Sequence, residues 1–128
     1  MFSPKNLSCA VQSWEYLPAA AGTYKAGQLL NANGGTLKPV SNASTTTPGY
    51  LCMADITVTD GEIIPVARVK KDAIYVTQLS AAAEGAAIGT KLQVSAGGLQ
   101  VDGAATGTFE LTDLEGTDAG CEVSGRFH

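Results

Sequence analysis

The chain has little charge and a single histidine. Of its 128 residues, 16% are Asp, Glu, Lys or Arg, and the histidine, His128, stands at the last position. The formal net charge is −4, and the basic residues are scattered apart from the pair Lys70 and Lys71. Because nucleic-acid binding by phosphate neutralisation needs a basic stripe, we expect no nucleic-acid partner. A surface with so few charges is typical of proteins that meet other proteins.

Residues for catalysis are equally scarce. A nucleophile with its base needs a histidine or a perturbed lysine beside Ser, Cys or Thr, and a terminal histidine is poorly held. Carboxylates crowd the 113–118 loop, which offers at best a weak calcium site. Glu110 and Glu122 lie on strand positions opposite the apolar side chains, so we expect them to face water. We therefore predict no enzyme, no catalytic residue, no cofactor and no metal.

Paired cysteines and long apolar runs are also missing. Cys9, Cys52 and Cys121 are odd in number and lack C-x-x-C spacing, so neither a disulfide framework nor a zinc site is indicated. We expect small buried apolar side chains in a reducing compartment. No stretch approaches the roughly 20 apolar residues that span a bilayer, and no signal peptide is recognisable. These absences predict a soluble protein without a membrane partner.

What the chain does contain is alternation with a period of two. Apolar and polar residues alternate over 91–95, 99–102, 108–111 and 121–127, and glycine-rich turns separate these segments. This pattern is typical of antiparallel strands with one buried face. The fold class predicted is all-β, a small antiparallel sandwich or barrel of about seven to nine short strands. At most one short helix is expected, at residues 79–85.

Local signals refine this fold. Asn33-Gly34-Gly35 predicts a tight hairpin, because Asn and Gly adopt the positive φ angles that such turns need. Pro39 cannot donate to a ladder and places its strand at a sheet edge. The β-branched run that follows the turn at residues 60–61 is expected in the core; its members are Ile63, Ile64, Val66 and Val69.

The first 24 residues differ from the rest and are interpreted as an extended N-terminal arm, with residues 25–128 as the β-rich body. Pro4 and Pro18 interrupt this segment, and Ala19 to Gly22 reads as a hinge of small residues. An arm can add a strand to a neighbour's sheet, while Trp14 and Tyr16 would share one face of it. The alternative is that both aromatics fold back as a plug of their own barrel. The residues expected to contact a partner are Phe2, Lys5, Leu7, Val11, Trp14, Tyr16, Leu17 and Tyr24.

A succession of turn-and-strand motifs carries a family resemblance. They are Ala26-Gly-Gln-Leu-Leu, Gly35-Thr-Leu-Lys-Pro-Val, Pro48-Gly-Tyr-Leu-Cys-Met, Gly61-Glu-Ile-Ile-Pro-Val-Ala-Arg-Val, Ile88-Gly-Thr-Lys-Leu-Gln-Val, Gly98-Leu-Gln-Val and the stretch from Leu114 to Phe127. In order and spacing, residues 25–127 resemble the small head decoration, or cement, proteins of tailed bacteriophages.

The resemblance implies a structural virion protein on the outer capsid surface, made in the host cytoplasm. Its partners would be the major capsid protein, contacted by the N-terminal arm, and copies of itself in a homotrimer. Two other functions stay open. One is an extracellular β-sandwich that binds glycans or adhesive partners, with Trp14, Tyr16, Tyr24 and Tyr50 as a stacking platform. The other is a minor tail or baseplate component.

Overall fold

The computed structural model describes residues 1–4, 14–40, 47–71 and 73–127, and these form twelve strands and no helix. The predicted all-β class is confirmed. The described strands outnumber the expected set because several are only two or three residues long. The strands are β1 (Ser3–Pro4), β2 (Trp14–Pro18), β3 (Gly22–Tyr24), β4 (Leu29–Asn33), β5 (Thr36–Pro39), β6 (Tyr50–Cys52), β7 (Ile56–Val58), β8 (Ile63–Arg68), β9 (Tyr75–Gln78), β10 (Lys91–Leu92), β11 (Phe109–Leu114) and β12 (Glu122–Phe127).

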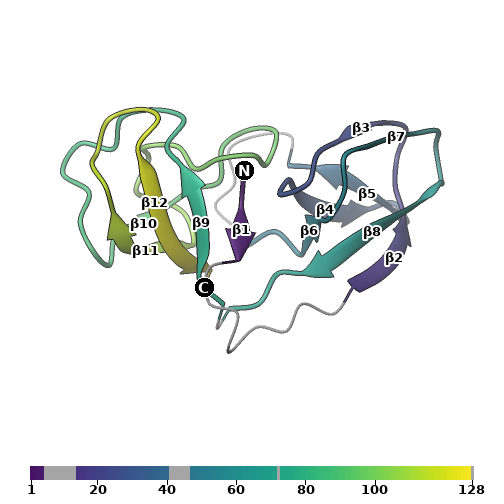
Figure 1. The fold of residues 1–128 in the computed structure, drawn as a ribbon, viewed down its shortest axis with the longest axis horizontal. Helices are drawn as coiled ribbons and strands as arrows, with labels where there is room; N and C mark the ends of the chain where they lie inside the picture. Colours follow the sequence, from purple (N-terminus) through teal and green to yellow (C-terminus); the bar gives the residue numbers. More distant parts are fainter. Residues whose placement is uncertain (5–13, 41–46, 72, 128) are drawn as a thin grey trace.

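The strands are arranged in two lobes with β1 between them (Figure 1). The N-terminal lobe, β2 to β8, contains a sheet of order β2-β8-β6-β4-β5 and the small β3-β7 pair. The C-terminal lobe, β9 to β12, contains a sheet of order β1-β9-β12-β11-β10, with β1 as its edge strand. All the pairings between these strands are antiparallel. Residues 79–85 form an isolated bridge, bends and a turn, which agrees with the expectation of at most one short helix.

The main sheet of the N-terminal lobe curls toward a barrel. Its two edge strands approach at one end, where Ala19 forms a parallel bridge with Leu37 and the Ala20 N–H donates to the Leu37 carbonyl at 2.9 Å. The β4-β5 hairpin turns through Gly34 and Gly35, whose φ angles of 66° and 88° suit the tight turn predicted. Since β5 is an edge strand, the position expected for Pro39 is confirmed.

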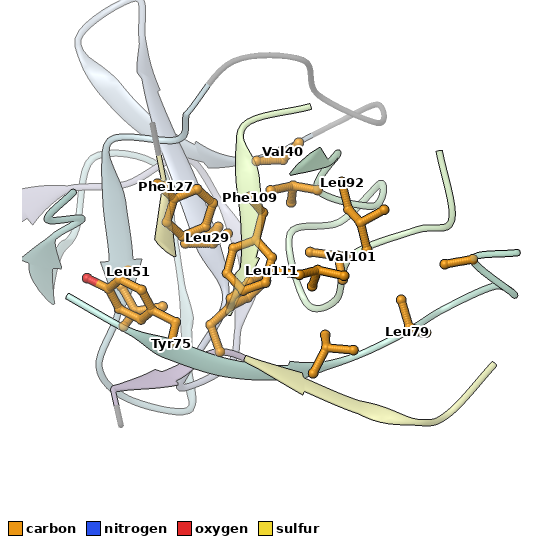
Figure 2. Close-up of a cluster of buried hydrophobic side chains, with 14 of the residues drawn as sticks. Leu29, Val40, Leu51, Tyr75, Leu79, Leu92, Val101, Phe109, Leu111 and Phe127 are labelled. Atoms are coloured by element: carbon orange, nitrogen blue, oxygen red, sulfur yellow. The ribbon is translucent and has the colours of Figure 1, made fainter. Parts of the chain in front are cut away.

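Two clusters of apolar side chains form the core. Strands β4 and β6 contribute side chains to both clusters, because successive residues of a strand point to opposite sides. Leu30 and Cys52 point into the barrel with Tyr24, Ile64 and Val66. Their chain neighbours point the other way, and in Figure 2 they lie in the larger cluster with aromatic residues of the C-terminal lobe. That larger cluster includes Leu29, Leu51, Tyr75, Phe109 and Phe127. The larger cluster is therefore shared by the two lobes, while the smaller one fills the barrel of the N-terminal lobe.

Backbone hydrogen bonds join the lobes along this shared core. The Leu29 N–H donates to the Gly98 carbonyl at 2.8 Å, and the Gly97 N–H donates to the Val40 carbonyl at 2.6 Å. The Gln28 side-chain amide also donates to the Gly97 carbonyl at 2.8 Å. These bonds give the two lobes a defined relative position.

Strands from the described part of the first 24 residues belong to all three sheets, which differs from an arm separate from the body. β1 pairs with β9, and β2 pairs with β8 along all five of its residues. Pro4 and Pro18, interpreted as interruptions, are the last residues of these strands. Both strands lie at sheet edges, where a proline costs no ladder bond if its nitrogen faces outward.

Candidate interaction surface

The outward face of β2 and β8 carries a group of exposed apolar side chains. Trp14 and Tyr16 are 51% and 65% exposed, and Ile63 is 55% exposed. In the ladder Tyr16 lies opposite Pro65 and Pro18 lies opposite Ile63. Trp14, Tyr16, Pro18, Ile63 and Pro65 therefore share one side of the sheet, because alternate residues of paired strands point the same way. We call these five residues the β2–β8 apolar face.

This face concentrates exposed apolar surface. Among the described residues, five large apolar side chains are exposed, and three of them, Trp14, Tyr16 and Ile63, belong to this face. The other two, Met1 and Ile88, lie apart from it in the sequence. A contiguous exposed apolar patch is typical of a site that another molecule covers.

The charged side chains of Glu15 and Arg68 project from the opposite side of the sheet. Glu15 alternates with Trp14 and Tyr16, and its carboxylate accepts a hydrogen bond from the Arg68 guanidinium at 2.8 Å. The Glu15 carboxylate raises the pKa of Arg68 above its ordinary value. Arg68 also lies over the Tyr50 ring, 5.6 Å from its centroid. The pair is neutral as a whole, so it adds no net charge beside the uncharged apolar face.

The structure separates the sequence-predicted contact residues into three groups. Trp14 and Tyr16 are exposed, whereas Leu17 points inward and packs against the barrel core. Phe2 and Tyr24 are 2% and 1% exposed, so the expectation that their side chains contact a partner is wrong in this structure. Burying a large ring gains more than leaving it in water. Lys5, Leu7 and Val11 lie outside the described residues, as does Cys9.

Trp14 and Tyr16 do not fold back as a plug of their barrel, and Phe2 is buried instead in the cluster shared with the C-terminal lobe. Its ring lies 5.6 Å from that of Phe109 and 5.9 Å from that of Phe127. Sequence reasoning also placed Ile63 in the core, where only Ile64 and Val66 are fully buried. Strict alternation through this strand would have identified Ile63 as outward-facing.

Two hollows lie beside Met1. One, of about 410 Å³, is lined by Met1, Cys52 and Gln78, and the other, of about 480 Å³, by Met1 and Asp55 among others. The Cys52 thiol donates to the Ala54 carbonyl, and burial raises its pKa. Since the thiolate is the effective nucleophile, the raised pKa favours the less nucleophilic thiol form of Cys52.

The carboxylates singled out in the sequence are dispersed. Glu110 accepts a hydrogen bond from Arg126 at 3.2 Å across the β11-β12 ladder, while Glu122 is exposed. Among the residues that the structure describes, no three His, Cys, Asp or Glu side chains form a group able to hold a metal ion. The 113–118 loop is thus not such a group.

No helix in the described ranges is long and apolar enough to cross a membrane. Neither a scan against protein-family models nor a search of curated proteins finds a match to this chain. Among the described residues, the β2–β8 apolar face is the surface that gathers the most exposed large apolar side chains.

Proposed function

We propose that this chain is a structural virion protein that decorates the outside of a bacteriophage capsid and stabilises it by bridging neighbouring capsomers. The observation that carries the proposal is the exposed, uncharged β2–β8 apolar face, which includes Trp14 and Tyr16 of the N-terminal segment. The order of turn-and-strand motifs over residues 25–127 supports it. In this proposal the face contacts the major capsid protein and the subunits form a homotrimer.

Trp14 and Tyr16 suit a contact with a protein shell. Both are rings that bury much area while losing few rotatable bonds, which is why such residues dominate interface energetics. They project from a strand that is paired with β8 along its whole length. A partner would therefore gain from binding without first ordering this strand.

The two-lobed scaffold also suits a cement protein. Backbone hydrogen bonds and one shared core join the lobes, so force applied to one lobe is transmitted to the other. A subunit that touches several capsomers at once gains avidity without strong individual contacts. Binding only to the expanded shell stabilises that state by mass action. Such a role needs no catalytic group.

The experiment is co-sedimentation with expanded, undecorated capsids of the phage whose genome encodes the chain. The wild-type protein should co-sediment and raise the temperature at which the shells break. The double variant Trp14→Ser/Tyr16→Ser should bind at least about tenfold more weakly, because these two rings are expected to be the anchors. Ile88→Ser is the matched control, since Ile88 is 63% exposed outside this face, and it should bind like wild type.

Failure of the wild-type chain to bind shells would contradict the proposal. Retention on a polysaccharide column, lost in the double variant, would favour the glycan-binding alternative, which the two exposed aromatics also suit. Tyr24 is buried and Tyr50 is half-buried under Arg68, so only two of the four aromatics considered for a stacking platform are well exposed. Binding to isolated tails rather than shells would favour the tail or baseplate alternative.

A further inference from the structure

The barrel of the N-terminal lobe is closed at one end and open at the other. At the closed end Ala19 and Leu37 bridge β2 to β5. Because this bridge is parallel, the residues before Ala19 and Leu37 also lie side by side, so Pro18 lies beside Thr36. Thr36 is the first residue of β5. Residues of β2 before Pro18 therefore extend past the start of β5. We call the gap along this part of β2 the open seam.

The backbone of β2 has hydrogen-bonding groups directed into the open seam. The Ala19 N–H donates to the Glu62 carbonyl, on the β8 side, at 2.9 Å, whereas the next N–H, of Ala20, donates toward β5. Successive residues of a strand direct their N–H and C=O groups to opposite edges. By this alternation the backbone N–H and C=O groups of Trp14 and Tyr16 point away from β8 and into the seam. A β-strand is the partner that satisfies such an edge.

A small apolar pocket lies at the inner side of the same seam. Its volume is about 180 Å³, and Leu17, Ala32, Leu37 and Tyr50 are among its lining residues. Leu17 belongs to the inner face of β2 and Ala32 is exposed near the end of β4. A strand added beside β2 would direct every second side chain toward this pocket, which has room for one aliphatic group.

We propose that the open seam binds an extended segment of the shell protein as an added strand, with one aliphatic side chain in the pocket beside Ala32. The lining is uncharged, and Arg68, which lies over the lining residue Tyr50, is paired with Glu15. The segment is therefore expected to be uncharged at the anchor. This inference rests on the proposed function for its partner, and it specifies how that partner is held.

The test begins with a displayed library of random seven-residue peptides, selected on the immobilised full chain. Peptides with an aliphatic residue should be enriched. Ala32→Leu, which fills the pocket from an exposed position, should weaken their binding at least about tenfold. Ala81→Leu, the same substitution at an exposed alanine outside the pocket lining, should not, because its side chain does not occupy the anchor space. Unchanged unfolding temperatures of both variants would establish that they fold.

A second pair of variants tests the backbone edge. Tyr16→Pro removes the outward N–H and should weaken peptide binding more than Tyr16→Ala, which removes the ring and keeps the N–H. In the complex the Tyr16 amide should exchange with solvent at least about tenfold more slowly than in the free chain, because it becomes hydrogen-bonded. No selected peptide, or equal binding to Ala32→Leu and wild type, would overturn the proposal.

The two proposals fail in different ways. If shells bind while no peptide is selected and the Tyr16 amide stays unprotected, the added strand is excluded and the decorating function stands. If peptides bind at the seam while shells do not, the decorating function and the assignment of the shell as partner fail together. If light scattering shows that the wild-type chain self-associates and Ala32→Leu does not, the occupant is a second copy instead of the shell protein.

Discussion

Phe2 is the residue whose environment differs most from the sequence-based expectation. It was expected on a partner-binding arm, and it lies in the core between Phe109 and Phe127. Its N–H also donates to the Gly27 carbonyl at 2.9 Å. The N-terminus thereby connects the C-terminal lobe, through β1, with the N-terminal lobe. A side chain near a chain end can stabilise the whole fold when it fills a cavity that no other residue fills.

Phe2→Ala should lower the free energy of unfolding by about 3–5 kcal/mol, because it removes a buried ring and leaves a cavity. Urea unfolding followed by Trp14 fluorescence measures this loss. Met1→Ala is the control, since Met1 is 45% exposed, and it should cost less than about 0.5 kcal/mol. Equal stabilities of Phe2→Ala and wild type would show that the N-terminus is not part of the core.

Tyr24 is a second buried residue, and its hydroxyl lies at the closed end of the barrel. It donates to the Ala20 carbonyl at 2.7 Å and lies 3.2 Å from the Leu37 carbonyl. Tyr24→Phe should lower the free energy of unfolding by about 1 kcal/mol, because it removes the donor to the Ala20 carbonyl, while the Leu37 carbonyl keeps its bond from the Ala20 N–H. Tyr16→Phe, on an exposed ring, should leave it unchanged. Thermal unfolding of the two variants gives the comparison.

Glu62 provides a pH-dependent test at the turn before β8. Hydrogen bonds from the Thr59 hydroxyl and the Thr59 N–H lower its pKa. A lowered pKa in the folded state means that the stabilising contribution is present above the ordinary glutamate pKa and is lost as the pH falls through the lowered value. Carboxyl NMR titration should find the Glu62 pKa below the ordinary range. Thr59→Ala should return it toward that range, and an unchanged value would contradict this explanation.

At the scale of elements, the joint between the lobes depends on one loop that approaches β4 closely. A Cβ at Gly98 would lie 2.3 Å from the Leu29 carbonyl oxygen, whereas a Cβ at Gly97 would meet nothing within 4 Å. The φ angles, +74° and +89°, are positive at both. The two glycines therefore separate the effect of close packing from the effect of backbone conformation.

Gly98→Ala should destabilise the protein more than Gly97→Ala does. Both substitutions cost about 1–2 kcal/mol for the positive φ, and Gly98→Ala adds about 1–3 kcal/mol for the clash with β4. Chemical denaturation of the two variants provides the measurement. Equal losses would mean that the lobes are not held as closely at Leu29 as described.

Sequence signals predicted the strands and turns well where neighbouring residues determine the local backbone conformation. The glycine pair after Asn33 fixed the β4-β5 hairpin, and alternation located β11 and β12. In the segments predicted as strands around Val94 and Val101, these two residues pair only through isolated bridges. Residues 79–85 form no helix, since Ala83 is buried and its N–H donates to the Thr117 carbonyl. Such pairings depend on residues far apart in the chain.

At the scale of the whole molecule, the sequence predicted two of the five residues of the β2–β8 apolar face. Spacing placed Trp14 and Tyr16 on one face, and they are exposed together. Ile63 completes the face only because β8 pairs with β2 in a particular register, which no local pattern specifies. The division into two lobes was also not predictable, because β1 pairs with β9, which lies near the middle of the chain and far from β1 in the sequence.

The most direct test of the account is an electron cryomicroscopy reconstruction of expanded capsids mixed with the wild-type chain. The account predicts two-lobed density in symmetry-related copies on the outer surface, with Trp14 and Tyr16 directed into the shell. Shells without added density would contradict it, and so would subunits bound with the β2–β8 apolar face directed to solvent.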